Sequence, residues 1–369
     1  MNTAIHNTKL PDNDFVVKNG VLTEYKGHDS NIMIPNDVLK IGDEVFYDNQ
    51  ELKSVIIPEG VTFLGRNIFN FCENIESISL PGSVVQINSG AFEGCKKLKS
   101  IKIPDNISII EERTFEFCES LETIELPRGI KRIESSAFEG CKKLKAIKIP
   151  DGVSTIEYGT FHDCTNLASI TLPKSLVNIE GGHDDDNYIY GAFEGCKNLK
   201  EIAIPEGVTF IDQYTFAGCT NLTKVDLPES LSFIGNNAFA NCTALEEITL
   251  PARLEKLGCE SFINCTSLKS IVIPNNVHTI RKFTFEGCSK LKSIILSNNI
   301  TVIEECTFKN CKKLTEISIP GSIVYIGKNI FEGCDSLSYV HIPESMKERS
   351  HFTQNFLGES FPYADIIVY

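Results

Sequence analysis

The sequence predicts an α/β repeat solenoid built from coils of about 23 residues each. Three periodic features predict this class. A cysteine recurs at one fixed interval, as from Cys72 to Cys95, with a single longer interval from Cys164 to Cys196. A phenylalanine lies three positions before each of these cysteines, and a leucine or isoleucine lies three positions after it. A segment of two aliphatic residues around one variable residue, as in Ile101-x-Ile103, then follows, and a proline comes next in all but one repeat. The periodic cysteines are Cys72, Cys95, Cys118, Cys141, Cys164, Cys196, Cys219, Cys242, Cys265, Cys288, Cys311 and Cys334.

Two short elements are predicted for each coil. The Ile-x-Ile segment, as at Ile101 to Ile103, alternates with period two and is rich in β-branched residues, so it predicts a strand. The proline that follows can end this strand. The spacing of three in Phe-x-x-Cys-x-x-Leu predicts one turn of α- or 3₁₀-helix. One strand per coil would build one parallel sheet, with neighbouring strands about 4.8 Å apart.

Three parts are expected along the chain. Residues 1–30 form an N-terminal capping hairpin, because Asn19-Gly20 is a favoured two-residue turn between apolar alternations. Such a hairpin would cover the first coil, which is an exposed end of the solenoid. Residues 31–343 form the solenoid of about 13 repeats, with an insertion at 181–189. Residues 344–369 form a C-terminal cap with a last strand after Ala364.

The repeat resembles the BspA-like, or Treponema pallidum-type, family of leucine-rich repeat proteins. The matching motif is Leu98-x-x-Ile101-x-Ile103-Pro104-x-x-Ile107-x-x-Ile110, then Thr114-Phe115-x-x-Cys118. The resemblance covers about residues 31–343 and implies a right-handed leucine-rich repeat superhelix. It also implies a non-enzymatic protein-binding module of the cell-surface adhesin or host-interaction type, whose partner is a host matrix or cell-surface protein. The alternative function is an intracellular protein-interaction scaffold.

Charge and composition bear on which classes of partner the protein binds and on where in the cell it acts. The formal charge is −14, from 35 basic and 49 acidic residues, so repulsion of phosphates argues against nucleic acid as a partner. No apolar stretch approaches the roughly 18 residues that a membrane-spanning helix needs, so we expect no such segment. Residues 1–14 are polar and do not read as a signal peptide. Localisation therefore stays open between the cell surface, if a leader was removed, and the cytoplasm, if Met1 is the native start. The oligomeric state is not predicted.

The sequence predicts that the periodic cysteines are unreactive core residues and form neither a metal site nor disulfides. No Cys-x-x-Cys occurs, and the histidines share no interval with the cysteines, which argues against zinc and disulfides. Each periodic cysteine reads as a small buried hydrophobe. Cys259 and Cys306 lie off the period and are expected at the surface. No nucleotide-binding or hydrolase motif is found, so we predict no enzyme activity and no cofactor.

The insertion is the sharpest irregularity, since insertions in solenoids often carry function. Three interpretations stay open. The segment is a charged surface loop, or His183 with the acidic run 184–186 coordinates a divalent cation, or Tyr188 and Tyr190 anchor a partner.

The outward positions of the predicted strands are the other candidates for partner binding. They lie five and seven positions after each cysteine. Most carry small or charged side chains, but an apolar patch and a C-terminal aromatic pair stand out. Packing under the cap explains that pair equally well. The candidates are Lys102, Glu125, Lys148, Thr171, Asp226, the patch Val272 with Ile295, and the pair Tyr339 with His341.

Overall fold

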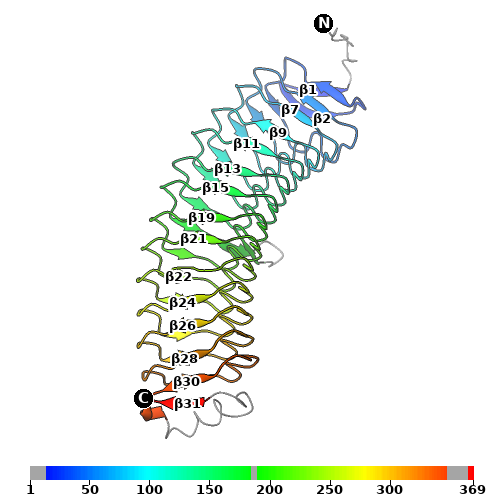
Figure 1. The fold of residues 1–369 in the computed structure, drawn as a ribbon. Helices are drawn as coiled ribbons and strands as arrows, with labels where there is room; N and C mark the ends of the chain where they lie inside the picture. The colour runs from blue at the N-terminus through cyan, green and yellow to red at the C-terminus, as the bar shows by residue number, and fades with distance from the viewer. Residues whose placement is uncertain (1–13, 184–188, 347–364) are drawn as a thin grey trace, which may run out of the picture.

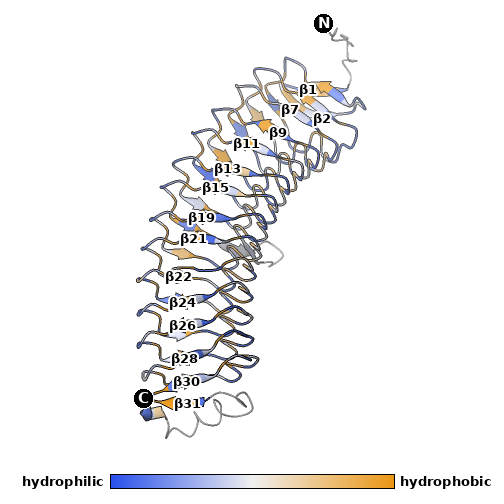
Figure 2. Ribbon diagram, in the orientation of Figure 1, coloured by the Kyte–Doolittle hydropathy of each residue, from blue (hydrophilic) through white to orange (hydrophobic). Residues whose placement is uncertain are grey.

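The computed structural model describes residues 14–183, 189–346 and 365–369. Successive coils stack side by side into an elongated, bent solenoid, with β1 at one end and β31 at the other (Figure 1). Hydrophobic and hydrophilic residues occur together in the coils along the whole length (Figure 2). The buried apolar side chains form one continuous core, as the periodic sequence predicts.

One column of strands follows the predicted Ile-x-Ile segments. Its middle residues point into the core and the flanking residues point outward, as in Ser100, Ile101 and Lys102. The strands pair in separate groups of two or three, and paired strands of successive coils are parallel and in register, so Ile101 lies opposite Ile124 of the next coil. The strands of this column are β3 (Asn31–Met33), β5 (Ser54–Ile56), β7 (Ser77–Ser79), β9 (Ser100–Lys102), β11 (Thr123–Glu125), β13 (Ala146–Lys148), β15 (Ser169–Thr171), β19 (Glu201–Ala203), β21 (Lys224–Asp226), β24 (Ser270–Val272), β26 (Ser293–Ile295), β28 (Glu316–Ser318) and β30 (Tyr339–Ile342).

A second column of parallel strands corrects the expectation of a single sheet. These strands have two residues each and end on the apolar residue fifteen positions after the cysteine, such as Ile87 after Cys72. They are too short to show an alternation in the sequence. They are β4 (Lys40–Ile41), β6 (Phe63–Leu64), β8 (Gln86–Ile87), β10 (Ile109–Ile110), β12 (Arg132–Ile133), β14 (Thr155–Ile156), β16 (Asn178–Ile179), β20 (Phe210–Ile211), β22 (Phe233–Ile234), β23 (Lys256–Leu257), β25 (Thr279–Ile280), β27 (Val302–Ile303) and β29 (Tyr325–Ile326).

The helical part of the predicted α/β class is not confirmed. Among the described residues the only helix is η1 (Glu344–Met346), a 3₁₀ turn that lies after the last coil. The Phe-x-x-Cys segment instead forms consecutive tight turns, in which the Cys72 N–H donates to the Phe69 carbonyl oxygen at 3.0 Å. The positions five and one before the cysteine have positive φ, as at Asn67 (51°) and Phe71 (58°). A left-handed residue at each of these positions stops a helix from propagating.

The phenylalanines form a continuous stack through the core. From Phe46 to Phe331, rings of successive coils lie 5.1 to 6.0 Å apart and within 17° of parallel. Offset stacking adds to the burial of these large side chains. The stack crosses the insertion without a break, since Phe161 and Phe193 are 5.5 Å apart and within 2° of parallel. The insertion therefore leaves the phenylalanine stack unchanged.

The periodic cysteines link each coil to the one before it. Each thiol donates to the carbonyl oxygen of the phenylalanine 26 residues earlier, or 35 residues earlier across the insertion, at 2.8 to 3.4 Å. The Phe69 carbonyl oxygen, for example, accepts both the Cys72 N–H and the Cys95 S–H. The cysteine is thus a small core residue that also donates one hydrogen bond, which alanine or valine could not do.

Additional strands lie at both ends of the solenoid. β1 (Phe15–Lys18) and β2 (Val21–Tyr25) are antiparallel, and Asn19 and Gly20 between them both have positive φ. The Tyr25 ring lies 5.3 Å from Phe46 and is tilted by 48° to it, so it contacts the end of the phenylalanine stack. At the other end, β31 (Asp365–Val368) is parallel to β30. No helix in the described part of the chain is long and apolar enough to cross a bilayer.

Candidate functional site

Four polar candidates on the first strand column are exposed and lie in two pairs. Lys102 is opposite Glu125 in register, and Lys148 is opposite Thr171. All four side chains point away from the core. They form a polar strip along the N-terminal half of the column.

The apolar candidates lie beside a hollow on the same column. Val272 and Ile295 are directly opposite each other, and they are 56% and 62% exposed. A hollow of about 1100 Å³ opens between β21 and β24 and is lined by Asp226 and Val272. Its floor crosses Glu247–Thr249, where the coil forms no strand although the sequence pattern predicts one. Asp226 and Val272 thus line one hollow, and Ile295 lies beside Val272 but outside the lining.

The C-terminal pair is partly covered by the last strand. In register, Tyr339 lies between Glu316 and Asp365, and His341 lies opposite Ile367 of β31. Tyr339 is nevertheless 45% exposed. His341 Nε2 is 3.8 Å from the Glu316 carboxylate. Pairing with β31 therefore covers part of Tyr339 and His341, so packing against the last strand stays an alternative to partner binding for these two residues.

The insertion begins and ends as a β-hairpin. β17 (Gly181–His183) and β18 (Ile189–Gly191) are antiparallel, with His183 opposite Ile189. The Tyr190 ring lies 4.6 Å from the His162 ring of the preceding coil. Tyr188 and the acidic run 184–186 lie outside the described residues. Within the described residues, no group of three or more His, Cys, Asp or Glu side chains is placed to hold a metal ion.

A polar column that the sequence reasoning missed lies two positions before the cysteines. It runs through Asn70, Glu93, Glu116, Glu139 and His162, one residue per coil. Glu116 is only 8% exposed, and burial, followed by the charges of Glu139 and Glu93, raises its pKa to about 8. Burial opposes protonation of His162, but the Glu139 carboxylate, 3.1 Å from Nδ1, outweighs it and raises the pKa of His162. The regular spacing of the three glutamates was the available signal.

Comparisons with known proteins agree with the observed fold. A family model described as the BspA type leucine rich repeat region matches residues 24–145, 85–183, 188–314 and 255–356. No curated protein matches the chain.

Solved structures of bacterial proteins resemble the solenoid over most of its length. A leucine-rich repeat protein from Bacteroides ovatus ATCC 8483 has a TM-score of 0.65 and 26% identity, and the match covers 96% of this chain and 100% of that one. A leucine rich cell surface protein from Faecalibacterium prausnitzii A2-165 has a TM-score of 0.53 and 27% identity, over 90% of this chain and 94% of that one. The pneumococcal vaccine antigen PcpA, at 21% identity and a TM-score of 0.52 over 98% of both chains, shares the fold.

Proposed function

Because the chain belongs to the BspA-type leucine rich repeat family, we propose that it is a non-catalytic protein-binding module that acts at the cell surface. Proteins of this fold supply an extended surface on which loops and strand faces contact partners. The partner we propose is a host matrix or cell-surface protein. The similarity to a leucine rich cell surface protein supports this location.

The observation that carries the proposal is the hollow between β21 and β24 with the apolar patch beside it. Val272 and Ile295 are more than half exposed on a strand face that is otherwise mostly polar or charged. Exposed apolar residues next to a concave, polar-rimmed surface are typical of protein-binding sites. Lys224 and Asp226 at the rim form an ion pair at 2.8 Å, so the rim is polar but locally neutral.

A binding assay with matched variants tests the proposal. The double variant Val272→Lys/Ile295→Lys should lose about tenfold or more in affinity for immobilised matrix proteins, because two charges would be desolvated on binding. Val324→Lys is the control, since Val324 is 71% exposed but lies outside the first strand column. Equal binding by the wild type and the double variant would contradict this site.

An intracellular interaction scaffold is the second candidate. All fourteen cysteines are free, and thiols are more common in reducing compartments. Antibody labelling of intact cells separates the two candidates, because only a surface protein is labelled before the cells are opened. Recovery of all the protein from the cytosol would reject the surface location.

A further inference from the structure

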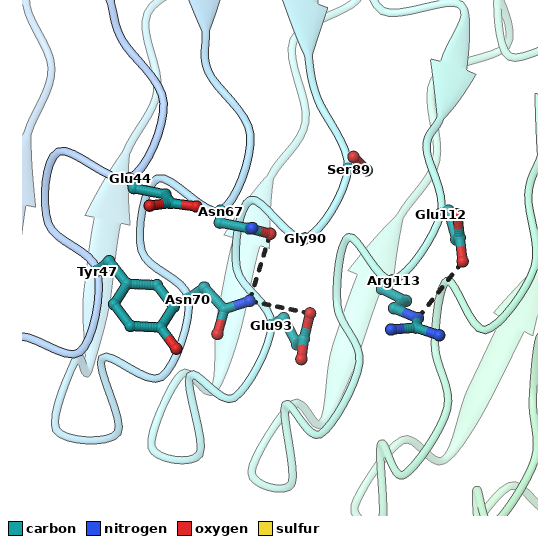
Figure 3. A pocket seen from close by; sticks show the side chains of 9 residues that line it. All are labelled: Glu44, Tyr47, Asn67, Asn70, Ser89, Gly90, Glu93, Glu112 and Arg113. Atoms are coloured by element: carbon teal, nitrogen blue, oxygen red, sulfur yellow. Dashed lines mark hydrogen bonds and ion pairs between the residues drawn. The ribbon is translucent and has the colours of Figure 1, made fainter. Parts of the chain in front are cut away.

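A polar pocket of about 620 Å³ lies near the N-terminal end of the solenoid, away from the hollow described above. It is formed by the tight-turn segments of the first coils (Figure 3). Glu44 and Tyr47 lie at one side of it, and Asn70 and Glu93 lie at its centre. Glu112 and Arg113 line the opposite side.

Asn70 carries a buried oxygen that needs a donor. The residue is 5% exposed, and its Nδ2 donates to Asn67 Oδ1 at 3.3 Å and to Glu93 Oε2 at 3.0 Å. Both of these partners are acceptors, which fixes the orientation of the amide. Its Oδ1 accepts no hydrogen bond from any residue that the structure describes. A buried polar atom without a partner costs free energy. This oxygen has almost no accessible surface, so a donor in the pocket reaches it only when the Asn70 side chain rotates.

The charges around the pocket favour a cation. Three carboxylates, of Glu44, Glu93 and Glu112, line it with one guanidinium. That guanidinium, of Arg113, already contacts Glu112 at 3.4 Å and Glu116 at 3.6 Å. Burial raises the pKa of Glu93, and Arg113 lowers it only in part. An added positive group would relieve this excess of negative charge.

The aromatic ring of Tyr47 lines one side of the pocket. Tyr47 is 48% exposed, and its ring is held edge-on against Phe71 at 6.1 Å and 82°. A ring of this kind can stack on a planar cation, and arginine is the side chain that most often does so.

We propose that this pocket binds the guanidinium group of an arginine residue on a partner protein. Five N–H donors in one plane can serve more than one of the lining carboxylates while the plane rests on a tyrosine. A lysine ammonium offers three donors and does not stack as a plane. The inference rests on the proposed function, because it names one side chain that the partner should present.

Calorimetric titration of the full chain with capped tripeptides tests this directly. Acetyl-Gly-Arg-Gly-amide should bind with a dissociation constant on the order of 1 mM. The citrulline peptide keeps the shape but loses the charge, and it should bind at least about tenfold more weakly. The lysine peptide should fall between the two.

Variants locate the binding. Glu93→Gln, which keeps the size of the side chain, and Tyr47→Ser should each weaken the arginine peptide about fivefold or more. Tyr325→Ser is the control, because Tyr325 is 46% exposed in the C-terminal half. Equal binding of the arginine and citrulline peptides, or unchanged binding in both variants, would overturn the site.

Two further outcomes are informative. One distinguishes free arginine from an arginine residue of a protein, and the other distinguishes the arginine pocket from the proposed function. Tighter binding of free arginine than of the capped peptide would contradict a protein ligand. The matrix-protein assay on the Val272→Lys/Ile295→Lys variant reports on the proposed function alone, because those residues lie outside this pocket. Peptide binding without any matrix-protein binding would therefore reject the proposed function and keep the arginine pocket.

Discussion

Replacing Glu116 by glutamine should stabilise the protein at neutral pH. The pKa of this carboxyl rises from 4.5 to about 8 on folding, because the side chain is buried and lies between Glu93 and Glu139 in the column. A carboxyl whose pKa is raised by folding contributes stability that is full below pH 4.5 and is lost as the pH rises through 8. Glutamine resembles the protonated form at every pH, so it avoids this loss.

The size of the effect follows from the same values. At pH 7 the unfolded carboxyl is about 2.5 pH units above its pKa of 4.5, whereas the folded carboxyl is still mostly protonated. Each pH unit is worth about 1.4 kcal/mol, so ionisation of the unfolded carboxyl favours unfolding by about 3 kcal/mol. The pKa of about 8 already includes the lowering by Arg113, which is 42% exposed, so the loss of that contact is not subtracted again. The expected net gain is about 3 kcal/mol at pH 7 and close to zero near pH 4.5.

Urea unfolding followed by circular dichroism at several pH values between 5 and 8 measures this gain. The midpoint difference between the variant and the wild type should grow with pH, provided that the slope of the transition stays the same. Glu332→Gln is the matched control, because Glu332 occupies the same coil position, is 47% exposed and pairs with Lys309 at 3.1 Å. The control should change stability by less than about 0.5 kcal/mol. Equal midpoints for Glu116→Gln and the wild type at pH 7 would refute the argument.

Three further predictions concern the core, the thiols and the insertion. Phe138→Ala should destabilise the fold by about 3 to 5 kcal/mol in urea unfolding, since the ring is fully buried between two stacked rings; a loss below about 1 kcal/mol would contradict the stack as a stabilising element. A thiol reagent should react quickly with only Cys259 and Cys306 in the native protein, because burial raises the pKa of the half-buried Cys334 thiol to about 12 and slows its reaction; after unfolding all fourteen thiols should react. A much larger fast fraction would show that the buried periodic cysteines are accessible. Deletion of 181–189 restores the regular cysteine spacing and should leave cooperative thermal unfolding intact, whereas loss of cooperativity would make the insertion structural.

The core was predictable because its positions repeat many times in the sequence. A phenylalanine three before and an aliphatic residue three after Cys95 mean little alone, but the same pair around each periodic cysteine specifies a stacked core. The turn geometry was less visible. The positive φ next to the cysteine is met by Gly94 in one coil and by Phe71 in another, so no single residue type marks it. A spacing of three was therefore interpreted as helical.

The candidate sites were predictable only in part. They lie where single coils differ from the repeat, and not every such difference is visible in the sequence. The exposed pair Val272 and Ile295 stood out, since both are apolar where most other coils are polar. The missing strand at 247–249, which shapes the hollow, has no marker in that coil. The arginine pocket combines Asn70, Glu93 and Tyr47, which are three different residue types at one coil position, and their burial follows only from the stacking.

Because most of the periodic cysteines are buried, the rate at which the protein is oxidised depends on the rate at which it unfolds. Burial raises the pKa of Cys72 and Cys265 to about 12, so almost none of their reactive thiolate forms while the coils stay stacked. An oxidant can reach these sulfur atoms only when a coil opens, and an opened chain would expose several thiols at once. In an oxidising compartment, folding would have to finish before disulfides form. After that, resistance to oxidation would be a kinetic property, measured by how rarely the solenoid opens.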